Sequence, residues 1–368
     1  MKKIFREFIS LGVTYSVGNV AQKALSIIFI PIYTTYLSIE DYGVLALMTL
    51  TVALLSRMVI TPVSSALGRF FYKPDYEEKR DVLLFSLFVL LLAKTLLLVL
   101  VYLIVSSAIA KLLFDDGKYL FVVKICGVTL VFSILSAYLL NMVRLFKMAK
   151  RYILMSLANL LITATLTLFF LIKMRLGLLS VVYGNIAGLA FLTFACIPTF
   201  IKNSKPRFQF SIMKEPLKYG YPLIVTGYSN LLIQSGDRYI LNIFQSLGSV
   251  GAYSFGYSVA SLVNVFLTVP VKRALMPVVF EAEKDRKTQT EFLVRVATYY
   301  YLVGGYIVLG LSIFARDIMV LLIRNQDFLI AWTIVPIISF SYLQHGLGNC
   351  LGWGITMKDS FSVAFRVS

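Results

Sequence analysis

The sequence has few charged residues, little cysteine and a single histidine, and each scarcity argues against a class of protein. Only 14% of the 368 residues are charged, against about a quarter in soluble domains, so a water-soluble fold is disfavoured. The three cysteines, Cys126, Cys196 and Cys350, lie far apart in apolar stretches, which argues against a disulfide scaffold or a cysteine metal site. His345 has no second histidine or carboxylate at ligand spacing, so we expect it to form structural hydrogen bonds.

Apolar residues dominate instead, and they are gathered in long runs. Hydrophobic residues make up 59% of the chain, and the mean hydropathy is +0.83. Runs of about 20 apolar residues are long enough to cross the hydrocarbon core of a bilayer as helices. The sequence therefore predicts an all-α fold, a polytopic transmembrane helical bundle. The ten predicted spans cover residues 11–36, 42–68, 82–106, 119–140, 153–172, 178–201, 219–244, 251–276, 291–314 and 328–352.

The charge that is present is mostly positive and alternates along the chain. The formal net charge is +17, but the basic residues are dispersed over short connections between apolar runs, so we expect no nucleic-acid partner. Alternate connections carry nineteen and six Lys and Arg residues, counted from the side that holds the N-terminus. Because basic residues accumulate in cytoplasmic loops, this asymmetry predicts a cytoplasmic N-terminus.

The longest connection divides the chain into two related halves. Residues 202–218 are basic and contain Pro206 and Pro216, which predicts a cytoplasmic linker between two transmembrane lobes, residues 1–201 and 219–368. A shift of 208 residues aligns the two lobes, which predicts pseudo-symmetric parallel repeats. The second lobe then holds at least four helices against six, so we expect a fragment, a truncated gene or a naturally shorter half. The aligned pairs are Gly12 and Gly220, Ser38 and Ser246, Gly43 and Gly251, Pro62 and Pro270, and Ala66 and Ala274.

Residues 219–244 are apolar enough to span a membrane but contain four strongly polar side chains. Asp237 and Arg238 are adjacent, while Asn230, Gln234 and Asp237 recur at i, i+4 and i+7 on one helical face. An aspartate at the centre of a membrane helix costs about 2.5 to 3.5 kcal/mol, so such residues normally face a bundle interior or a wet cavity. This segment is therefore the leading candidate for the functional site.

The first apolar run carries a matching polar stripe. Asn19, Lys23 and Ser26 have the same i, i+4, i+7 spacing, with Gln22 beside them. The 208-residue shift places Gln22 on Asn230, so two repeat-related helices would present polar faces to a central cavity. The alternative is that these side chains form hydrogen bonds between helices and only hold the bundle together.

Cations outnumber acids deep within the predicted spans. Lys23, Arg57, Lys94 and Arg238 lie there against one acid, Asp237. Unbalanced buried charges are hard to stabilise, so we infer an anionic ligand bearing phosphate or pyrophosphate, with purely structural pairing as the alternative. Asp237 either balances a neighbouring cation or couples transport to a proton or sodium gradient. The pattern predicts no cofactor and no metal.

Three stretches carry a family resemblance: FISLGVTYSVGNVAQKALSIIFIPIYTTYLSIEDYGVLAL near the start, SGDRYIL in the seventh predicted span, and GSVGAYSFGYSVA after it. They resemble bacterial polysaccharide transporters, the Wzx-type flippases of O-antigen and capsule repeat units in the multidrug/oligosaccharidyl-lipid/polysaccharide (MOP) superfamily. The resemblance implies a multi-pass protein of the bacterial inner membrane that takes part in polysaccharide and lipopolysaccharide biosynthesis. It also implies two six-helix lobes, from which the ten predicted helices depart.

The resemblance further implies a substrate and a mechanism. Undecaprenyl-pyrophosphate-linked glycan would move from the cytoplasmic to the periplasmic leaflet by alternating access, without chemistry, among membrane lipids and other polysaccharide-assembly proteins. Lys23, Arg57 and Arg238 would hold the pyrophosphate, and the sugars would occupy the wet cavity. The alternatives are a multidrug or lipid II exporter of the same superfamily, a membrane-embedded glycosyltransferase or polymerase, and an inactive remnant. The expected substrate-binding residues are Asn19, Gln22, Lys23, Arg57, Asn230, Gln234 and Arg238.

Overall fold

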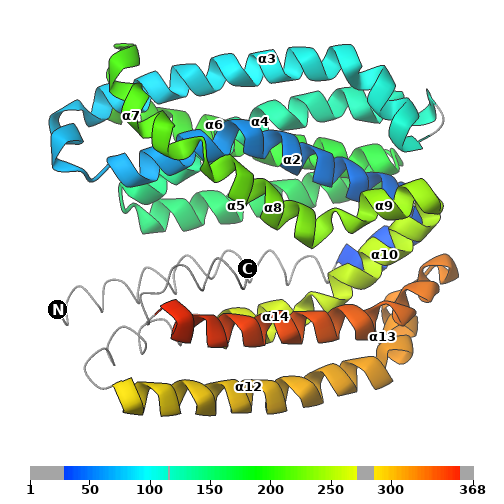
Figure 1. Cartoon of the computed structure of the whole chain (residues 1–368). Helices are drawn as coiled ribbons and strands as arrows, with labels where there is room; N and C mark the ends of the chain where they lie inside the picture. Colours follow the sequence, from blue (N-terminus) through cyan, green and yellow to red (C-terminus); the bar gives the residue numbers. More distant parts are fainter. Residues whose placement is uncertain (1–28, 115–116, 272–285, 357–368) are drawn as a thin grey trace. The chain divides into compact units, whose positions relative to one another are not determined.

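The computed structural model describes residues 29–114, 117–271 and 286–356, and within these ranges the chain forms helices and turns without any strand (Figure 1). This confirms the predicted all-α fold. Among the described residues, seven helices are long and apolar enough to cross a membrane, and the bent pair Gln326–Thr333 and Val335–Gly348 raises that number to eight. The seven are Ile39–Phe70, Pro74–Phe114, Gly117–Leu145, Ala149–Lys173, Leu178–Asn203, Leu247–Val271 and Val294–Ile313.

The described residues divide into two compact units. The first comprises residues 36–114 and 117–250, and the second comprises residues 29–35, 251–271 and 286–356. The chain passes from the first unit to the second after residue 250, whereas the predicted linker covers residues 202–218. The division into two lobes at that linker stays a prediction. The helices of the first unit are α2 (Ile39–Phe70), η1 (Pro74–Lys79), α3 (Arg80–Phe114), η2 (Gly117–Tyr119), α4 (Leu120–Leu145), α5 (Ala149–Leu168), η3 (Phe169–Lys173), α6 (Leu178–Asn203), α7 (Phe210–Gly220), α8 (Leu223–Ser235) and α9 (Asp237–Phe244).

Helix α2 lies at the centre of the first unit, in contact with α3, α4, α7 and α8. It begins with a capping box, because Asp41 N donates to Ser38 Oγ over 3.0 Å and Ser38 N donates to Asp41 Oδ2 over 3.3 Å. Its buried face packs into a cluster with α3 and α4, in which the hydroxyl of Tyr138 donates to Leu84 O over 2.8 Å. The buried hydroxyl of Tyr138 therefore has a hydrogen-bond acceptor.

Two glycines one helical turn apart bring α5 and α6 together. A methyl group added at Gly184 would overlap Thr167, and one at Gly188 would overlap Thr163 and Asn159. Small residues at i and i+4 let two membrane helices approach closely and gain van der Waals contact where no hydrophobic effect drives association. This spacing explains why α5 and α6 can form the most extensive helix pair among the described residues.

The seventh predicted span is broken into short helices rather than continuous. Pro222, which has no backbone N–H, lies between α7 and α8, and Gly236 lies between α8 and α9. Helix α9 packs within the first unit, because the hydroxyls of Tyr239 on α9 and Thr51 on α2 share a hydrogen bond of 2.7 Å. Asn242, also on α9, belongs to the same unit. Helix α7 also occupies part of the predicted linker, since Ile212, Met213, Pro216, Leu217 and Gly220 form a buried face.

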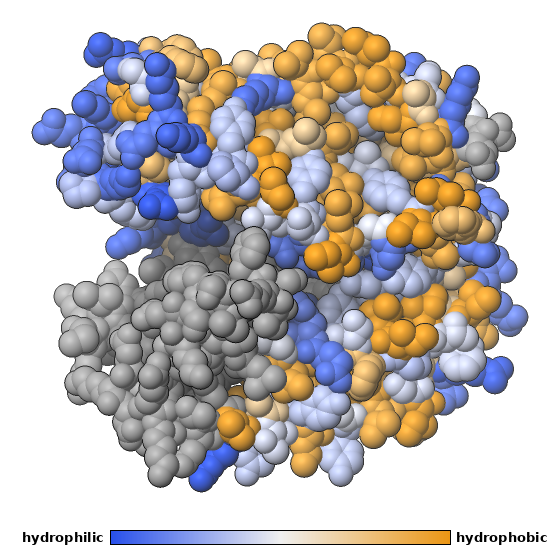
Figure 2. Space-filling model, viewed as in Figure 1, coloured by the Kyte–Doolittle hydropathy of each residue, from blue (hydrophilic) through white to orange (hydrophobic). Residues whose placement is uncertain are grey.

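Hydrophilic side chains gather at the end of the first unit where α2 meets η1 and α7 begins, seen at the upper left of Figure 2. Glu215 on α7 accepts from Lys73 Nζ over 3.0 Å and from the Tyr76 hydroxyl over 3.0 Å. The connection before α7 is held by an ion pair of 2.6 Å between Lys205 and Asp81. These contacts fasten α7 to the polar end of α2 and α3.

The second unit packs around a smaller apolar cluster. Gly304 and Gly346 bring α12 and α14 together, because a methyl group at either would overlap Leu343 or Tyr300 on the facing helix. Tyr300 also shares a 2.9 Å hydroxyl hydrogen bond with Thr268. Its helices are α10 (Leu247–Ala260, whose first residues belong to the first unit), η4 (Asn264–Thr268), α12 (Arg286–Ile313), α13 (Ala315–Leu322), η6 (Gln326–Thr333) and α14 (Val335–Thr356).

Thr34 and Asn242, which are related by the 208-residue shift, each make a long-range hydrogen bond to the backbone. Within the second unit, Thr34 Oγ1 accepts from Arg324 N over 3.3 Å. Within the first unit, Asn242 donates from Nδ2 to Leu113 O over 2.8 Å. Each side chain thus ties the end of its helix to a backbone group far away in sequence.

Candidate functional site

Three of the predicted substrate-binding residues, Asn19, Gln22 and Lys23, lie outside the described residues. Arg57 lies in the interior of α2, and its side chain is exposed at the protein surface. Its guanidinium donates from Nη1 to the carbonyl oxygen of Gly227 on α8, over 3.4 Å. Arg57 therefore contacts the first part of the polar segment that the sequence singles out.

The other predicted residues lie on α8 and α9. Asn230 is exposed, and its Nδ2 donates to Thr226 O over 3.0 Å, one turn earlier in the same helix. Gln234 is also exposed, whereas Asp237 and Arg238 are partly buried at the start of α9. Asp237 accepts from the backbone N–H of Arg238 over 2.9 Å, and a carboxylate in the first helical turn is stabilised by the helix dipole. The helix break thus supplies a local reason for the acid in this position.

Lys94, midway along α3, is stabilised by an aromatic ring. Its ammonium donates to the Tyr221 hydroxyl and lies 4.6 Å from the centroid of that ring. A cation over an aromatic face is attracted by the ring quadrupole without any acid being present. The contact joins the centre of α3 to the turn between α7 and α8.

The ion pairs of the described residues involve neither Arg57 nor Lys94. No group of three His, Cys, Asp or Glu within this part of the chain could hold a metal ion. Arg57 and Lys94 are therefore two cations within the spans that no ion pair with an acid neutralises in the described part of the chain. The ion pairs are Lys73–Glu215, Arg80–Glu77 and Lys205–Asp81.

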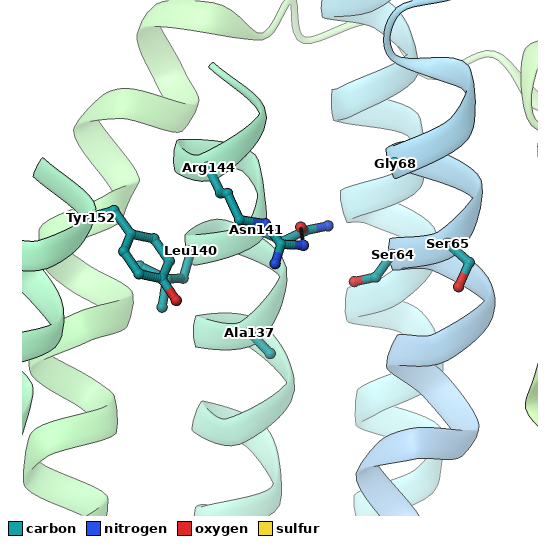
Figure 3. A pocket seen from close by; sticks show the side chains of 8 residues that line it. All are labelled: Ser64, Ser65, Gly68, Ala137, Leu140, Asn141, Arg144 and Tyr152. Atoms are coloured by element: carbon teal, nitrogen blue, oxygen red, sulfur yellow. Dashed lines mark hydrogen bonds between the residues drawn. The ribbon is translucent and has the colours of Figure 1, made fainter. Parts of the chain in front are cut away.

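An open polar groove of about 490 Å³ lies between α2, α4 and the start of α5 (Figure 3). Arg144 is exposed at its edge and donates from Nη2 to Asn141 Oδ1 over 2.6 Å. Both side chains point across the groove toward Ser64 on α2. No carboxylate lines the groove, so its potential is positive. The lining residues are Ser64, Ser65, Gly68, Ala137, Leu140, Asn141, Arg144 and Tyr152.

One face of α2 joins this groove to Arg57. Arg57, Thr61, Ser64 and Gly68 follow one another at intervals of three or four residues, which places them on the same side of the helix. Seven residues separate Ser64 from Arg57, a distance of about 10 Å along the helix axis. The first unit thus presents a polar stripe that runs from its basic end to a deep arginine.

Sequence reasoning missed the groove, although a signal for it was present. Arg144 was counted with the basic residues of a connection, and Ser64 and Ser65 lie next to Pro62 in an otherwise apolar run. On α4, however, Asn141 and Arg144 lie three residues apart and therefore share one helical face. Such a polar face on a membrane helix indicates contact with water or with a polar neighbour.

Comparison with known proteins identifies a family and similar folds. The family model for polysaccharide biosynthesis proteins matches residues 12–283. Among solved structures, the lipid II flippase MurJ in an inward closed conformation superposes with a TM-score of 0.77 at 17% identity, covering 95% of this chain and 77% of that chain. An inward-facing multidrug resistance MATE family transporter of the MOP superfamily gives 0.66 at 14% identity, covering 95% and 86%.

A third structure, a MOP superfamily transporter from Pyrococcus furiosus, gives a TM-score of 0.64 at 14% identity and covers 95% of this chain and 83% of that chain. No curated protein matches the chain. At these identities, the superpositions establish the fold that the three transporters and this chain have in common.

Proposed function

Because the chain belongs to the family of polysaccharide biosynthesis proteins and has the fold of membrane transporters, we propose that it is a flippase for lipid-linked glycan. Its substrate is an oligosaccharide repeat unit linked through pyrophosphate to a polyprenyl lipid. The protein moves this substrate by alternating access across the bacterial inner membrane, from the cytoplasmic leaflet to the periplasmic leaflet. The translocated unit then serves the synthesis of O-antigen or capsular polysaccharide.

The observation that carries this proposal is a positive charge within the described spans that no acid balances. Arg57 is exposed in the interior of a 32-residue apolar helix, and its guanidinium donates to a neutral carbonyl rather than to an acid. An arginine held at that depth is costly and is normally retained for a ligand or another functional role. Its planar guanidinium suits two oxygens of a phosphate, so a pyrophosphate is the ligand that matches it.

Residue roles follow from this assignment. Lys23, Arg57 and Arg238 bind the pyrophosphate, while Asn19, Gln22, Asn230 and Gln234 offer hydrogen bonds to sugar hydroxyls. Asp237 balances the charge of its cationic neighbours, and coupling to a proton or sodium gradient is the second role open to it. The polyprenyl tail stays in lipid, and the N-terminus lies in the cytoplasm, as the asymmetry of basic residues favours.

Two alternatives within the superfamily differ in the ligand that they require. A multidrug exporter that takes cationic compounds would need acids near the ligand, which fits poorly with the cations of α2 and α3. A lipid II exporter carries the same polyprenyl pyrophosphate and therefore makes the same use of Arg57, so it differs from the proposal only in the sugar. An embedded glycosyltransferase or polymerase would transfer sugar, whereas a flippase only changes its leaflet.

The proposal is tested by replacing Arg238 in cells whose surface glycan depends on this gene. We expect Arg238→Ala to abolish surface glycan while the protein remains in the membrane at the wild-type level, and lipid-linked repeat units should accumulate. Arg238→Lys, which keeps the charge, should restore part of the glycan. Wild-type amounts of surface glycan in Arg238→Ala would contradict the assignment of Arg238.

A further inference from the structure

We propose that the groove between α2, α4 and α5 is a separate binding site for pyrophosphate, which takes the head of the lipid-linked substrate before Arg57 does. The inference rests on the proposed function for the identity of the lipid. It concerns residues that lie outside the set expected from the sequence. The groove therefore adds a first station to the pathway along α2 (Figure 3).

The groove offers the donors that a pyrophosphate requires. Arg144 is oriented by Asn141, whose Oδ1 accepts from Nη2 over 2.6 Å, and the guanidinium extends across the groove toward α2. The Ser64 side chain points from α2 toward Asn141, and its hydroxyl forms no hydrogen bond within the described part of the chain, whereas Ser229, for example, bonds to Val225 O over 3.0 Å. The Ser64 hydroxyl is therefore available to a ligand in the groove.

Size and charge also fit an anionic head group. A volume of about 490 Å³ falls within the range of roughly 300 to 1,000 Å³ that is typical of small-molecule sites. The groove has no acidic lining residue, and Arg144 at its edge carries a positive charge that takes part in none of the ion pairs of the described residues. Gly68 has no side chain to fill the groove, and a methyl group added there would meet no atom within 4 Å. An anion is therefore attracted to the groove and has room to enter it.

The groove and Arg57 lie on one helical face of α2, and the groove is nearer the basic end of that helix. The step from Ser64 to Arg57 is about 10 Å, with Thr61 between them on the same face. Thr61 and Arg57 are thus the next polar side chains that this face of α2 offers beyond the groove. The order groove first, Arg57 second, follows from the position of Arg144 at the basic end of the helices, which the charge asymmetry assigns to the cytoplasm.

The site is tested by direct binding to the purified full chain in nanodiscs of zwitterionic phosphatidylcholine. The probe is farnesyl pyrophosphate, and the protein carries Arg57→Ala so that binding at the deep arginine is reduced. We expect Arg144→Gln to weaken binding about tenfold, because it removes a charge-assisted hydrogen bond to phosphate. The matched control is Lys150→Gln, which removes a neighbouring charge that does not line the groove and should leave the affinity unchanged.

Gly68→Leu provides a second variant that does not remove any charge. It fills the groove from a position where the backbone has free space, so the helix should be retained while binding is lost. Equal affinity of Arg144→Gln, Gly68→Leu and the parent for farnesyl pyrophosphate would overturn the proposed site. Loss of binding in both variants, with retention in Lys150→Gln, supports it.

Competition separates the sources of phosphate. Inorganic pyrophosphate should displace the probe, whereas nanodiscs containing phosphatidylglycerol should leave probe binding nearly unchanged. Equal competition by phosphatidylglycerol would assign the groove to bulk lipid and overturn the inference. If the wild-type chain binds the probe through Arg144 but does not move lipid-linked glycan between leaflets, the proposed function fails and the pyrophosphate site stands.

Discussion

Replacing Arg57 by methionine should make the protein more stable and less active at the same time. Removal of an arginine from the centre of a membrane helix relieves about 2.5 to 3.5 kcal/mol on insertion scales. The substitution also removes the 3.4 Å hydrogen bond from the guanidinium to Gly227 O. A long hydrogen bond of this kind contributes about 1 kcal/mol or less, so the net gain is on the order of 2 kcal/mol.

The activity should change in the opposite direction. A charge-assisted hydrogen bond to pyrophosphate contributes about 1.5 to 3 kcal/mol, so its removal lowers transport at limiting substrate by about tenfold or more. The assays are the thermal midpoint of the purified chain in detergent and the rate of glycan translocation in vesicles. Arg57→Lys should keep part of the activity, and Lys111→Met, at the end of α3, should leave it unchanged. A less stable Arg57→Met with full activity would show that Arg57 is structural and would refute the reasoning.

Three further predictions follow from particular contacts. Gly188→Leu should lower the thermal midpoint, because overpacking against Thr163 and Asn159 costs about 1 to 3 kcal/mol, whereas Gly68→Ala should not; equal midpoints would contradict the packing of α5 on α6. The hydrogen bond from Lys73 holds the pKa of Glu215 below the ordinary value of 4.5, so its contribution is present above that value and lost as the pH falls through the folded pKa. The midpoint of wild type should therefore drop more on acidification than that of Glu215→Gln, and parallel curves would argue against the contact. Lys147→Cys should react with a membrane-impermeant thiol reagent only from the cytoplasmic side and Lys118→Cys only from the opposite side; the reverse pattern would invert the predicted orientation.

Hydropathy was sufficient to place the continuous spans, because long apolar helices in lipid need no partner to be recognisable. It failed at residues 219–244, where average hydropathy is high but Pro222 and Gly236 divide the segment into α8 and α9. It also missed α7, since a short amphipathic helix has a modest average hydropathy and shows itself only by the spacing of Ile212, Met213, Pro216 and Leu217.

The candidate site could be anticipated only in part. The depth of Arg57 within a span follows from its position in the sequence, but its contact with Gly227 depends on how α8 folds back on α2. Arg144 was counted with the basic residues of a connection, because the charge rule treats a cation near a span end as a loop residue. That Arg144 and Asn141 line the same groove as Ser64 depends on the packing of α4 on α2, which periodicity alone does not specify.

The most direct test of the account is leaflet reorientation by the purified chain. Vesicles are prepared with a polyprenyl-pyrophosphate oligosaccharide in both leaflets and then treated from outside with a glycosidase that cannot cross the membrane. We expect protein-containing vesicles to lose all of the intact lipid-linked oligosaccharide, whereas protein-free vesicles lose only the outer-leaflet share, and without glycosidase the oligosaccharide stays chemically unchanged in both. Protection of the inner-leaflet pool in the presence of the wild-type chain would contradict the assignment as a flippase.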